Sequence, residues 1–337
     1  MFDDALLDDR RALDAADEPL RRLAQAGARV RIESAEAGPG YAVLADIGRP
    51  RAVVAAGTDA RLIRALLEPV CPVPFVAWPQ DGLPGWVGAL DLVVVLAADE
   101  ADPGLLATVH EAVRRGARLL IACPNPGIVA DHARSRTTVL LPTRTGDTLA
   151  AAVIVLAALH VAGLGPAVDP EAVAQAMDEI AEDCSPYADI AVNPAKDLAL
   201  GLADSQPLIW GGSVLAARAA RRIAEGVRAA TGRAALAADA TALLPVLEGT
   251  PVRDPFADPF LDTGQSARPT LVVLEDGNST GPVRQSRARL VQTAEIADVR
   301  VCVVAHERGS DVERYAALLQ TGQYAAIYLA VALGRYR

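Results

Sequence analysis

Small and polar residues follow several apolar runs of the sequence, and their types and spacing make them candidates for chemistry. Gly211-Gly212-Ser213 closes one such run. A Gly-Gly-Ser turn that opens a helix can present backbone N–H groups and a hydroxyl to a phosphate, although it can also be only an N-cap in a tight turn. Gly57-Thr58 closes an earlier run in a similar way. Both turns are therefore candidate phosphate-binding sites.

A second polar group, His306-Glu307-Arg308, follows another apolar run. A histidine and a carboxylate can act as acid and base, and an arginine beside them can bind a phosphate. The alternative is a solvated loop that does no chemistry. We keep His306 and Glu307 as candidate catalytic residues and Arg308 as a candidate phosphate ligand.

No metal or nucleotide cofactor is expected from the sequence. The cysteines are far apart, without a Cys-x-x-Cys pair, which excludes a zinc ribbon or a disulfide framework and fits a reducing compartment. No two histidines have metal-ligand spacing together with a carboxylate. Neither a G-x-G-x-x-G turn nor a P-loop is present. The cysteines are Cys71, Cys123, Cys184 and Cys302.

The composition limits the possible classes of protein. The chain has 337 residues, of which 52% are hydrophobic, and a net charge of −10. This length predicts about two domains, the apolar content excludes disorder, and the negative charge argues against sequence-independent nucleic-acid binding. The acidic N-terminus does not resemble a secretory signal, so we expect a cytoplasmic protein. The uncharged run 149–166 is too short and Ala-rich for a membrane span, and predicts a helix buried between domains or subunits.

Apolar runs alternate with helical patterns through most of the chain. The runs are continuous rather than alternating, which is typical of parallel strands covered on both faces. The expected strands are 51–57, 74–78, 91–97, 117–123, 137–141, 207–213, 270–274 and 300–305. The sequence therefore predicts an α/β fold.

The second half of the sequence repeats the plan of the first. The strand-loop-helix-strand unit 91–123 corresponds to 270–304, and each half contains a strand that ends in glycine and a hydroxyl residue. This predicts two flavodoxin-like αβα sandwich domains with parallel sheets, joined by helices. We expect an N-terminal helical segment over 1–45, a first domain over 46–150, connecting helices over 151–204, and a second domain over 205–337 that ends in a long helix.

Three segments resemble one known family. Asn193-Pro-Ala-Lys-Asp-Leu-Ala199 is similar to the Asn-Pro-Ala-Lys-x-Leu-Ala segment of bifunctional phosphoglucose/phosphomannose isomerases. Residues 322–330 resemble the C-terminal Gly-Asp-Tyr-x-x-x-Tyr-Leu-Ala helix of that family. Residues 274–276, with Arg284 or Arg287 after them, are similar to its Leu-Arg-Asp segment and downstream arginine. The resemblance implies two sugar isomerase (SIS) domains and a homodimer, because the family builds its site across two subunits. The uncharged helix, which needs a cover, also favours a dimer.

The residues that carry the family's chemistry are mostly replaced. Isomerisation of an aldose to a ketose needs a carboxylate base, a ring-opening acid/base group and donors for the phosphate. The family's Ser-Tyr-Ser-Gly-Asn-Thr phosphate loop corresponds here to the end of 95–102, where acids replace the hydroxyls and would repel a phosphate. The family's Gly-Gly-Ser-Gly turn is reduced to 56–59.

The family's base and its ring-opening histidine also lack counterparts. Matched through Pro245, the histidine falls at Gly249 and the base falls near Gly232-Arg233. Glu248 is kept as a candidate displaced carboxylate.

Three hypotheses follow. The first is a SIS protein that binds a sugar phosphate or a partner with its isomerase activity weak or lost. The second is an active isomerase of glucose 6-phosphate and mannose 6-phosphate with a rearranged site. The third is a dimeric scaffold without a ligand.

Overall fold

The computed structural model describes residues 2–44, 48–57, 59–98, 102–251 and 268–336. It divides into two compact units, which are described separately. We call Ala26–Gln175 the N-terminal unit. The C-terminal unit combines Met1–Gln25 with Ala176–Arg337, and the boundary at 175/176 falls within helix α8 (Pro170–Asp183).

The N-terminal unit is built on a five-stranded parallel sheet of order β2-β1-β3-β4-β5. Strand β3 (Leu92–Leu96) lies at its centre and is buried throughout, as its unbroken apolar sequence predicts. The other strands are β1 (Val53–Gly57), β2 (Phe75–Ala77), β4 (Arg118–Pro124) and β5 (Thr138–Thr143).

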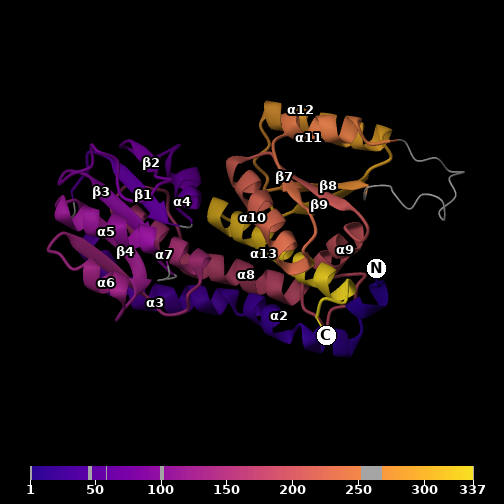
Figure 1. The fold of residues 1–337 in the computed structure, drawn as a ribbon, viewed down its shortest axis with the longest axis horizontal. Helices are drawn as coiled ribbons and strands as arrows, with labels where there is room; N and C mark the ends of the chain where they lie inside the picture. Colours follow the sequence, from indigo (N-terminus) through magenta and orange to yellow (C-terminus); the bar gives the residue numbers. More distant parts are fainter. Residues whose placement is uncertain (1, 45–47, 58, 99–101, 252–267, 337) are drawn as a thin grey trace, which may run out of the picture. The chain divides into compact units, whose positions relative to one another are not determined.

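Helices cover both faces of this sheet (Figure 1). Helices α5 (Pro103–Arg114) and α6 (Ile128–His132) pack together on one face, with the side chains of β3 and β4 beneath them. Helices α4 (Ala60–Leu67) and α7 (Thr148–Val161) pack against each other and contact the sheet, and α3 (Ala26–Leu44) packs on α7 and on the edge strand β5. The expected αβα sandwich is therefore confirmed in this unit.

Helix α7, which contains most of the uncharged run 149–166, is buried by other elements of its own unit. Residues 150–159 of α7 are all buried, against α3 and strands of the sheet. We expected this helix to lie between domains or subunits, so its burial no longer argues for a second copy of the chain. Within the described residues, no helix has the length and apolar character needed to cross a membrane.

The C-terminal unit repeats the plan with a parallel sheet of order β7-β6-β8-β9. Its strands are β6 (Gln206–Gly211), β7 (Leu236–Ala237), β8 (Pro269–Glu275) and β9 (Arg300–Ala305). The sequence β8-α12-β9 corresponds to β3-α5-β4 of the first sheet, which confirms the internal repeat.

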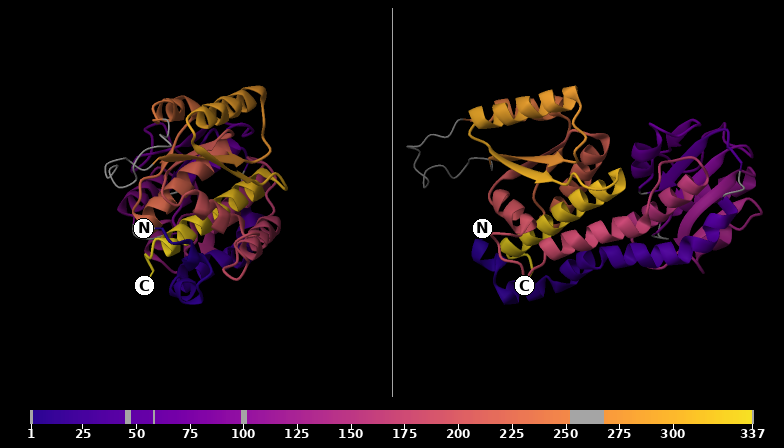
Figure 2. Two further views of the ribbon diagram at one scale, coloured as in Figure 1. Left: turned by 90° about the vertical axis from the view of Figure 1, so that its right-hand side faces the viewer. Right: turned by 180° about the vertical axis from the view of Figure 1, so that it is seen from behind.

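Two helical layers enclose the second sheet. Helices α11 (Ala240–Glu248) and α12 (Gly281–Ile296) lie together on one face, and the long α13 (Asp311–Ala332) lies on the other (Figure 2). Helix α10 (Val214–Thr231) and the short α9 (Pro194–Gly201) pack against α13. The expected long C-terminal helix is therefore the centre of one layer.

The N-terminal segment folds against the C-terminal unit. It forms η1 (Asp4–Leu7), α1 (Arg10–Ala15) and α2 (Asp17–Ala24). The Asp3 N–H donates to the Ala332 carbonyl at 2.9 Å, and the Gln320 side chain donates to the Leu23 carbonyl at 3.1 Å. The compact units divide the chain at 25/26 and 175/176, whereas the sequence places boundaries at 45/46, 150/151 and 204/205, which remain predictions.

Candidate functional site

The Gly-Gly-Ser turn lines a pocket of about 420 Å³ at the carboxyl end of β6. We call it the β6 pocket. Its volume lies in the range of roughly 300–1,000 Å³ that is usual for small-molecule sites. In an open α/β sheet, ligands bind beyond the carboxyl ends of the strands, which is where this pocket lies. Its lining comprises residues 210–214, 217, 220, 221, 238–241, 282, 283 and 286.

The first turns of three helices meet at the β6 pocket. Ser213 is the N-cap of α10, and its hydroxyl accepts a hydrogen bond from the Ala216 N–H at 2.9 Å. Asp239 is the N-cap of α11 and accepts from the Ala242 N–H at 2.9 Å. Helix α12 begins beside them, with Pro282 in its first turn. Because each helix N-terminus carries a partial positive charge, the three together favour an anion.

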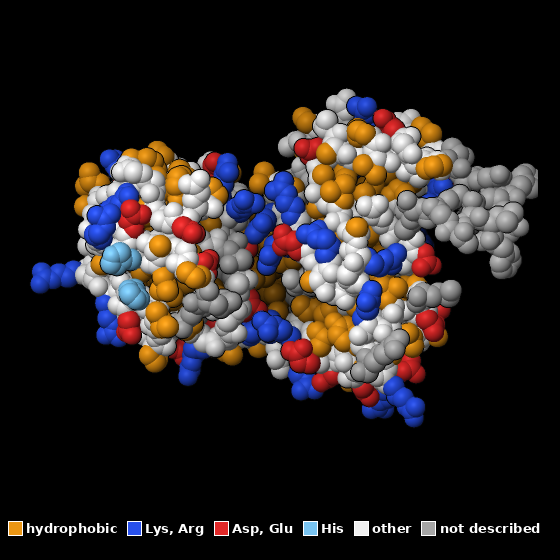
Figure 3. All heavy atoms as spheres, viewed as in Figure 1, with side chains coloured by type: hydrophobic (Ala, Val, Ile, Leu, Met, Phe, Trp, Pro, Cys, Tyr) orange, Lys and Arg blue, Asp and Glu red, His pale blue; other side chains and the backbone are white. Residues whose placement is uncertain are grey.

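Polar side chains add to this field. Arg221 comes from α10, Thr241 from α11 and Ser286 from α12. Arg221 is exposed and forms no ion pair with any other described residue, so its guanidinium is available to a ligand. Figure 3 shows arginine side chains in blue over the part of this unit that α10 occupies in Figure 1.

The two glycines of the turn are required by packing. A Cβ on Gly211 would lie 2.2 Å from the Ala216 carbonyl carbon, because the strand approaches the helix backbone closely there. A Cβ on Gly212 would lie 2.4 Å from Val283 and 2.8 Å from the Trp210 ring. The two glycines allow the turn to pack this closely, and they contribute only backbone atoms to the lining of the pocket.

Ser213 is also occupied by structural bonds. Its hydroxyl donates to the carboxylate of Asp276, which follows β8 and is 5% exposed. A phosphate dianion only accepts hydrogen bonds, so this hydroxyl has no proton to offer it. Arg221, Thr241 and Ser286 are thus the side chains suited to hold a phosphate, together with backbone N–H groups of the helix starts.

The structure places His306, Glu307 and Arg308 away from the β6 pocket. They follow β9, which is separated from β6 by β8, and none of them lines the pocket. Burial lowers the pKa of His306, an effect that Glu179 opposes. Glu307 lies beside Gly277, where an added Cβ would be 3.3 Å from the Glu307 Cβ. Glu307 and Arg308 are both exposed.

The other positions that the sequence analysis singled out lie outside the β6 pocket. Glu248, at the end of α11, is exposed and lies 3.9 Å from Arg289 of α12. Gly249 follows it as the C-cap of α11. Gly232 ends α10 with a φ of 70°, and Arg233 donates to backbone carbonyls of the turn before β6. None of these four lines the β6 pocket.

A smaller pocket of about 290 Å³ lies at the equivalent position of the N-terminal unit. Gly57 lines it with Arg61, Asp81 and Asp102, while Thr58 lies outside the described residues. Two carboxylates face one guanidinium, a balance that disfavours a phosphate dianion. This agrees with the acids expected near the end of β3, of which residues 99 and 100 also lie outside the described part.

Sequence reasoning missed the side chains that complete the β6 pocket. Arg221 lies two turns into a helix full of arginines, and Thr241 and Ser286 stand on helices that follow other strands, so no local pattern marks them. Across the described residues, no group of three metal-ligating side chains is present.

Comparisons with known proteins agree with this architecture. Residues 191–335 match the family of the bacterial phospho-glucose isomerase C-terminal SIS domain. No curated protein matches the chain.

Several solved structures share the fold. Tagatose-6-phosphate ketose/aldose isomerase from Escherichia coli is 15% identical, with a TM-score of 0.66 over 95% of this chain and 94% of that one. The C-terminal domain of glucosamine-fructose-6-phosphate aminotransferase from Francisella tularensis is 11% identical, with a TM-score of 0.65 over 94% and 96%. A glucose-6-phosphate isomerase like protein from Thermus thermophilus is 17% identical, with a TM-score of 0.54 over 90% and 92%. The chain thus has the tandem SIS-like fold, and its residues 191–335 match the bacterial phospho-glucose isomerase C-terminal SIS domain family.

Proposed function

We propose that this protein binds a sugar phosphate in the β6 pocket of its C-terminal unit and that its isomerase activity is weak or lost. The observation that carries the proposal is the meeting of three helix N-termini with the guanidinium of Arg221. Backbone N–H groups and a fixed cation are what a phosphate needs. The hydroxyls of Thr241 and Ser286 and the carboxylate of Asp239 can bind sugar hydroxyls.

The balance of charge favours this pocket over its counterpart in the N-terminal unit. Among the described residues, Asp239 is the single carboxylate that lines the β6 pocket, and it already accepts a hydrogen bond from its own helix. The pocket at Gly57 has two carboxylates, Asp81 and Asp102. A phosphate dianion is therefore expected in the C-terminal unit.

Loss of isomerase activity is proposed because the described lining of the pocket offers no suitable acid/base pair. His306 and Glu307 lie beyond β8, and the position that the family resemblance assigns to the histidine is Gly249. Asp239 already accepts a hydrogen bond from the Ala242 N–H as the N-cap of α11, and no histidine or second carboxylate lines the described pocket beside it.

Binding can be tested by isothermal titration calorimetry with glucose 6-phosphate and fructose 6-phosphate, using glucose as the uncharged control. We expect both phosphates to bind and glucose not to bind. Arg221→Gln should weaken binding tenfold or more, since a hydrogen bond to a charged group contributes about 1.5–3 kcal/mol. Arg289→Gln, an exposed arginine of α12 outside the pocket, should leave affinity unchanged. Equal affinity in both variants would place the phosphate elsewhere.

Turnover can be tested by proton NMR of fructose 6-phosphate and mannose 6-phosphate in D₂O. Abstraction of a proton from C1 or C2 would introduce deuterium even when net conversion is slow, and we expect none. Deuterium that enters with the wild type but not with His306→Gln or Glu307→Gln would establish the rearranged isomerase instead. Absence of both binding and exchange would leave the scaffold hypothesis.

A homodimer and a cytoplasmic location remain parts of this proposal. The dimer rests on the resemblance alone, because α7 is already covered by α3. Gel filtration at low salt that shows only monomer would exclude it.

A further inference from the structure

The two sequence segments with the strongest family resemblance meet beneath a second cavity. This cavity, of about 730 Å³, lies in the C-terminal unit, and we call it the Tyr187 pocket. Asn193 and Lys196 belong to the first segment, and Tyr324 and Tyr328 belong to the second. The lining comprises Asp8, Arg10, Leu13, Asp14, Asp17, Leu20, Arg21, Ala24, Ala181, residues 185–189 and Tyr324.

Buried side chains donate hydrogen bonds to the backbone of one wall of this pocket. The wall is the loop 184–189, and four of its carbonyls point inward to side chains of the two segments. The Tyr328 hydroxyl donates to Cys184 O at 2.6 Å, Asn193 Nδ2 to Ser185 O at 2.9 Å, and Lys196 Nζ to Pro186 O at 3.2 Å and Ala188 O at 3.0 Å. The backbone of the loop is therefore fixed before any ligand arrives.

Lys196 also connects this wall to the N-terminal segment. It is the only lysine of the chain and is 1% exposed. Its Nζ lies 2.9 Å from the carboxylate of Asp8, just before α1, and 5.8 Å from the centre of the Tyr328 ring. One buried ammonium thus joins both sides of the pocket.

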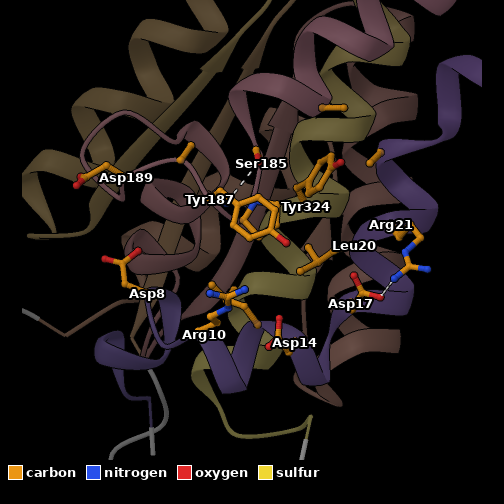
Figure 4. A pocket seen from close by; sticks show the side chains of 15 residues that line it. Asp8, Arg10, Asp14, Asp17, Leu20, Arg21, Ser185, Tyr187, Asp189 and Tyr324 are labelled. Carbon is orange, nitrogen blue, oxygen red and sulfur yellow. Dashed lines mark hydrogen bonds and ion pairs between the residues drawn. The ribbon is translucent and has the colours of Figure 1, made fainter.

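The fixed loop presents an exposed aromatic ring. Tyr187 is 84% exposed, and Figure 4 shows its ring in the middle of the pocket, near Tyr324. An exposed ring on a fixed backbone loses little conformational freedom when a ligand covers it. Leu13 and Leu20 supply apolar surface nearby.

The charges that line the pocket favour a cation. There are four carboxylates and two guanidinium groups. Asp17 pairs with Arg21, and Asp8 pairs with Lys196. Among the described residues, Asp14 and Asp189 form no ion pair with a cation, and Arg10 forms none with a carboxylate. Two unpaired carboxylates therefore line the pocket together with one unpaired guanidinium group. Figure 4 shows that Arg10 and Asp14 come from α1, whereas Asp189 lies on the loop.

We propose that the Tyr187 pocket binds a small organic cation, an ammonium or guanidinium group on an apolar stem. The carboxylates of Asp14 and Asp189 attract the charge, and the face of the Tyr187 ring accepts it through a cation–π contact. Leu13 and Leu20 take up the stem. This site is separate from the β6 pocket, and its test is independent of sugar-phosphate binding.

The test is calorimetric titration of the full chain with agmatine, which carries a guanidinium and an ammonium on a four-carbon stem. Pentanoate, with a similar stem and the opposite charge, is the matched control ligand. We expect agmatine to bind and pentanoate not to bind. Asp14→Asn and Tyr187→Ala should each weaken agmatine binding about tenfold, which corresponds to about 1.4 kcal/mol.

Asp204→Asn is the control variant, because Asp204 is an exposed aspartate of the same unit outside the pocket. It should bind agmatine like the wild type, and all three variants should melt near the wild-type temperature because the substituted side chains are exposed. Absence of agmatine binding at millimolar concentration, binding of pentanoate at equal strength, or an equal effect of Asp204→Asn and Asp14→Asn would overturn the proposal.

Discussion

Lys196 illustrates how much one buried charge can organise. Its ammonium is removed from water, which is expensive unless hydrogen bonds replace the lost solvation. The Asp8 carboxylate and two loop carbonyls provide those bonds. The Asp8 side chain is more than half exposed, so the ion pair links a buried ammonium to a carboxylate that is in contact with solvent.

Lys196→Met should lower the free energy of unfolding by about 3 kcal/mol, since it leaves the carbonyls of Pro186 and Ala188 without their donor. Asp8→Asn should lower it by less, because the ammonium keeps both carbonyls and the amide oxygen can still accept. Urea denaturation of both variants measures the difference. Equal losses would show that the ion pair, and not the loop carbonyls, determines the stability.

Asp91 gives the N-terminal unit a dependence on pH. Burial alone would raise its pKa, but the hydrogen bonds from Arg51 and the Gly88 N–H, with the charge of Arg51, outweigh burial and hold the pKa below its usual value. A carboxyl with a depressed pKa in the folded state stabilises the fold above its unfolded value of about 3.9. That stability is lost as the pH falls through the folded-state pKa.

Asp91→Asn should therefore remove part of the acid sensitivity. Urea unfolding at pH 6 should show the variant to be less stable than the wild type, and the difference should shrink as the pH falls below 4. A gap that stays constant down to pH 2.5 would contradict the pKa shift.

At the scale of the element, helices α10 and α13 approach each other through Gly322. A Cβ at this position would lie 2.4 Å from the Ile223 side chain. The helices can approach this closely only because the side chain is missing, so the glycine of the second family segment has a packing role here.

Gly322→Ala should destabilise the C-terminal unit by about 1–3 kcal/mol, the usual range for overpacking. Ile223→Ala on its own should also destabilise it, by leaving a cavity. The double variant should lose clearly less than the sum of the two, because the smaller side chain makes room for the new methyl group. Strict additivity in denaturation experiments would show that the helices separate instead.

The sequence was sufficient for the elements and insufficient for the pockets. Continuous apolar runs predicted β3, β4, β6, β8 and β9 within about two residues. Strands β3, β4, β6 and β8 are buried along most of their length, as such runs indicate, whereas the edge strand β9 is partly exposed. Two-residue β7 has no such pattern. The Tyr187 pocket joins segments near residues 8–24, 181–189 and 324, and no rule of local periodicity relates segments so far apart.

The sequence left two explanations open for the glycines of the turn 211–212, a phosphate site or a tight turn that caps a helix. The structure shows that packing requires both glycines, and phosphate binding at the turn stays a prediction. Spacing alone could not separate these two explanations, because both require a residue without a side chain.

At the scale of the whole molecule, each unit has its own sheet and hydrophobic core. Trp210 lies in the core of the C-terminal unit, while Trp78 and Trp86 lie in the N-terminal unit. Tryptophan fluorescence can therefore report on the units one at a time.

With Trp210 as the only tryptophan (Trp78→Phe, Trp86→Phe), Lys196→Met should move the urea midpoint to lower concentration. With Trp210→Phe, so that only the N-terminal unit reports, Lys196→Met should leave the midpoint unchanged. Equal shifts in both backgrounds would mean that the chain unfolds as one cooperative block.

The packing of residues 1–25 on the last helix has a consequence for synthesis. The partners of Asp3 and Leu23, Ala332 and Gln320, are made about 300 residues later. At a translation rate of about 5–20 residues per second, the first segment leaves the ribosome roughly 15–60 s before its partners exist. Residues 26–175, which form the N-terminal unit, are complete within that interval and can fold before residues 1–25 do. A nascent-chain chaperone would therefore find the apolar side chains of residues 1–25 unburied until the last helix is made.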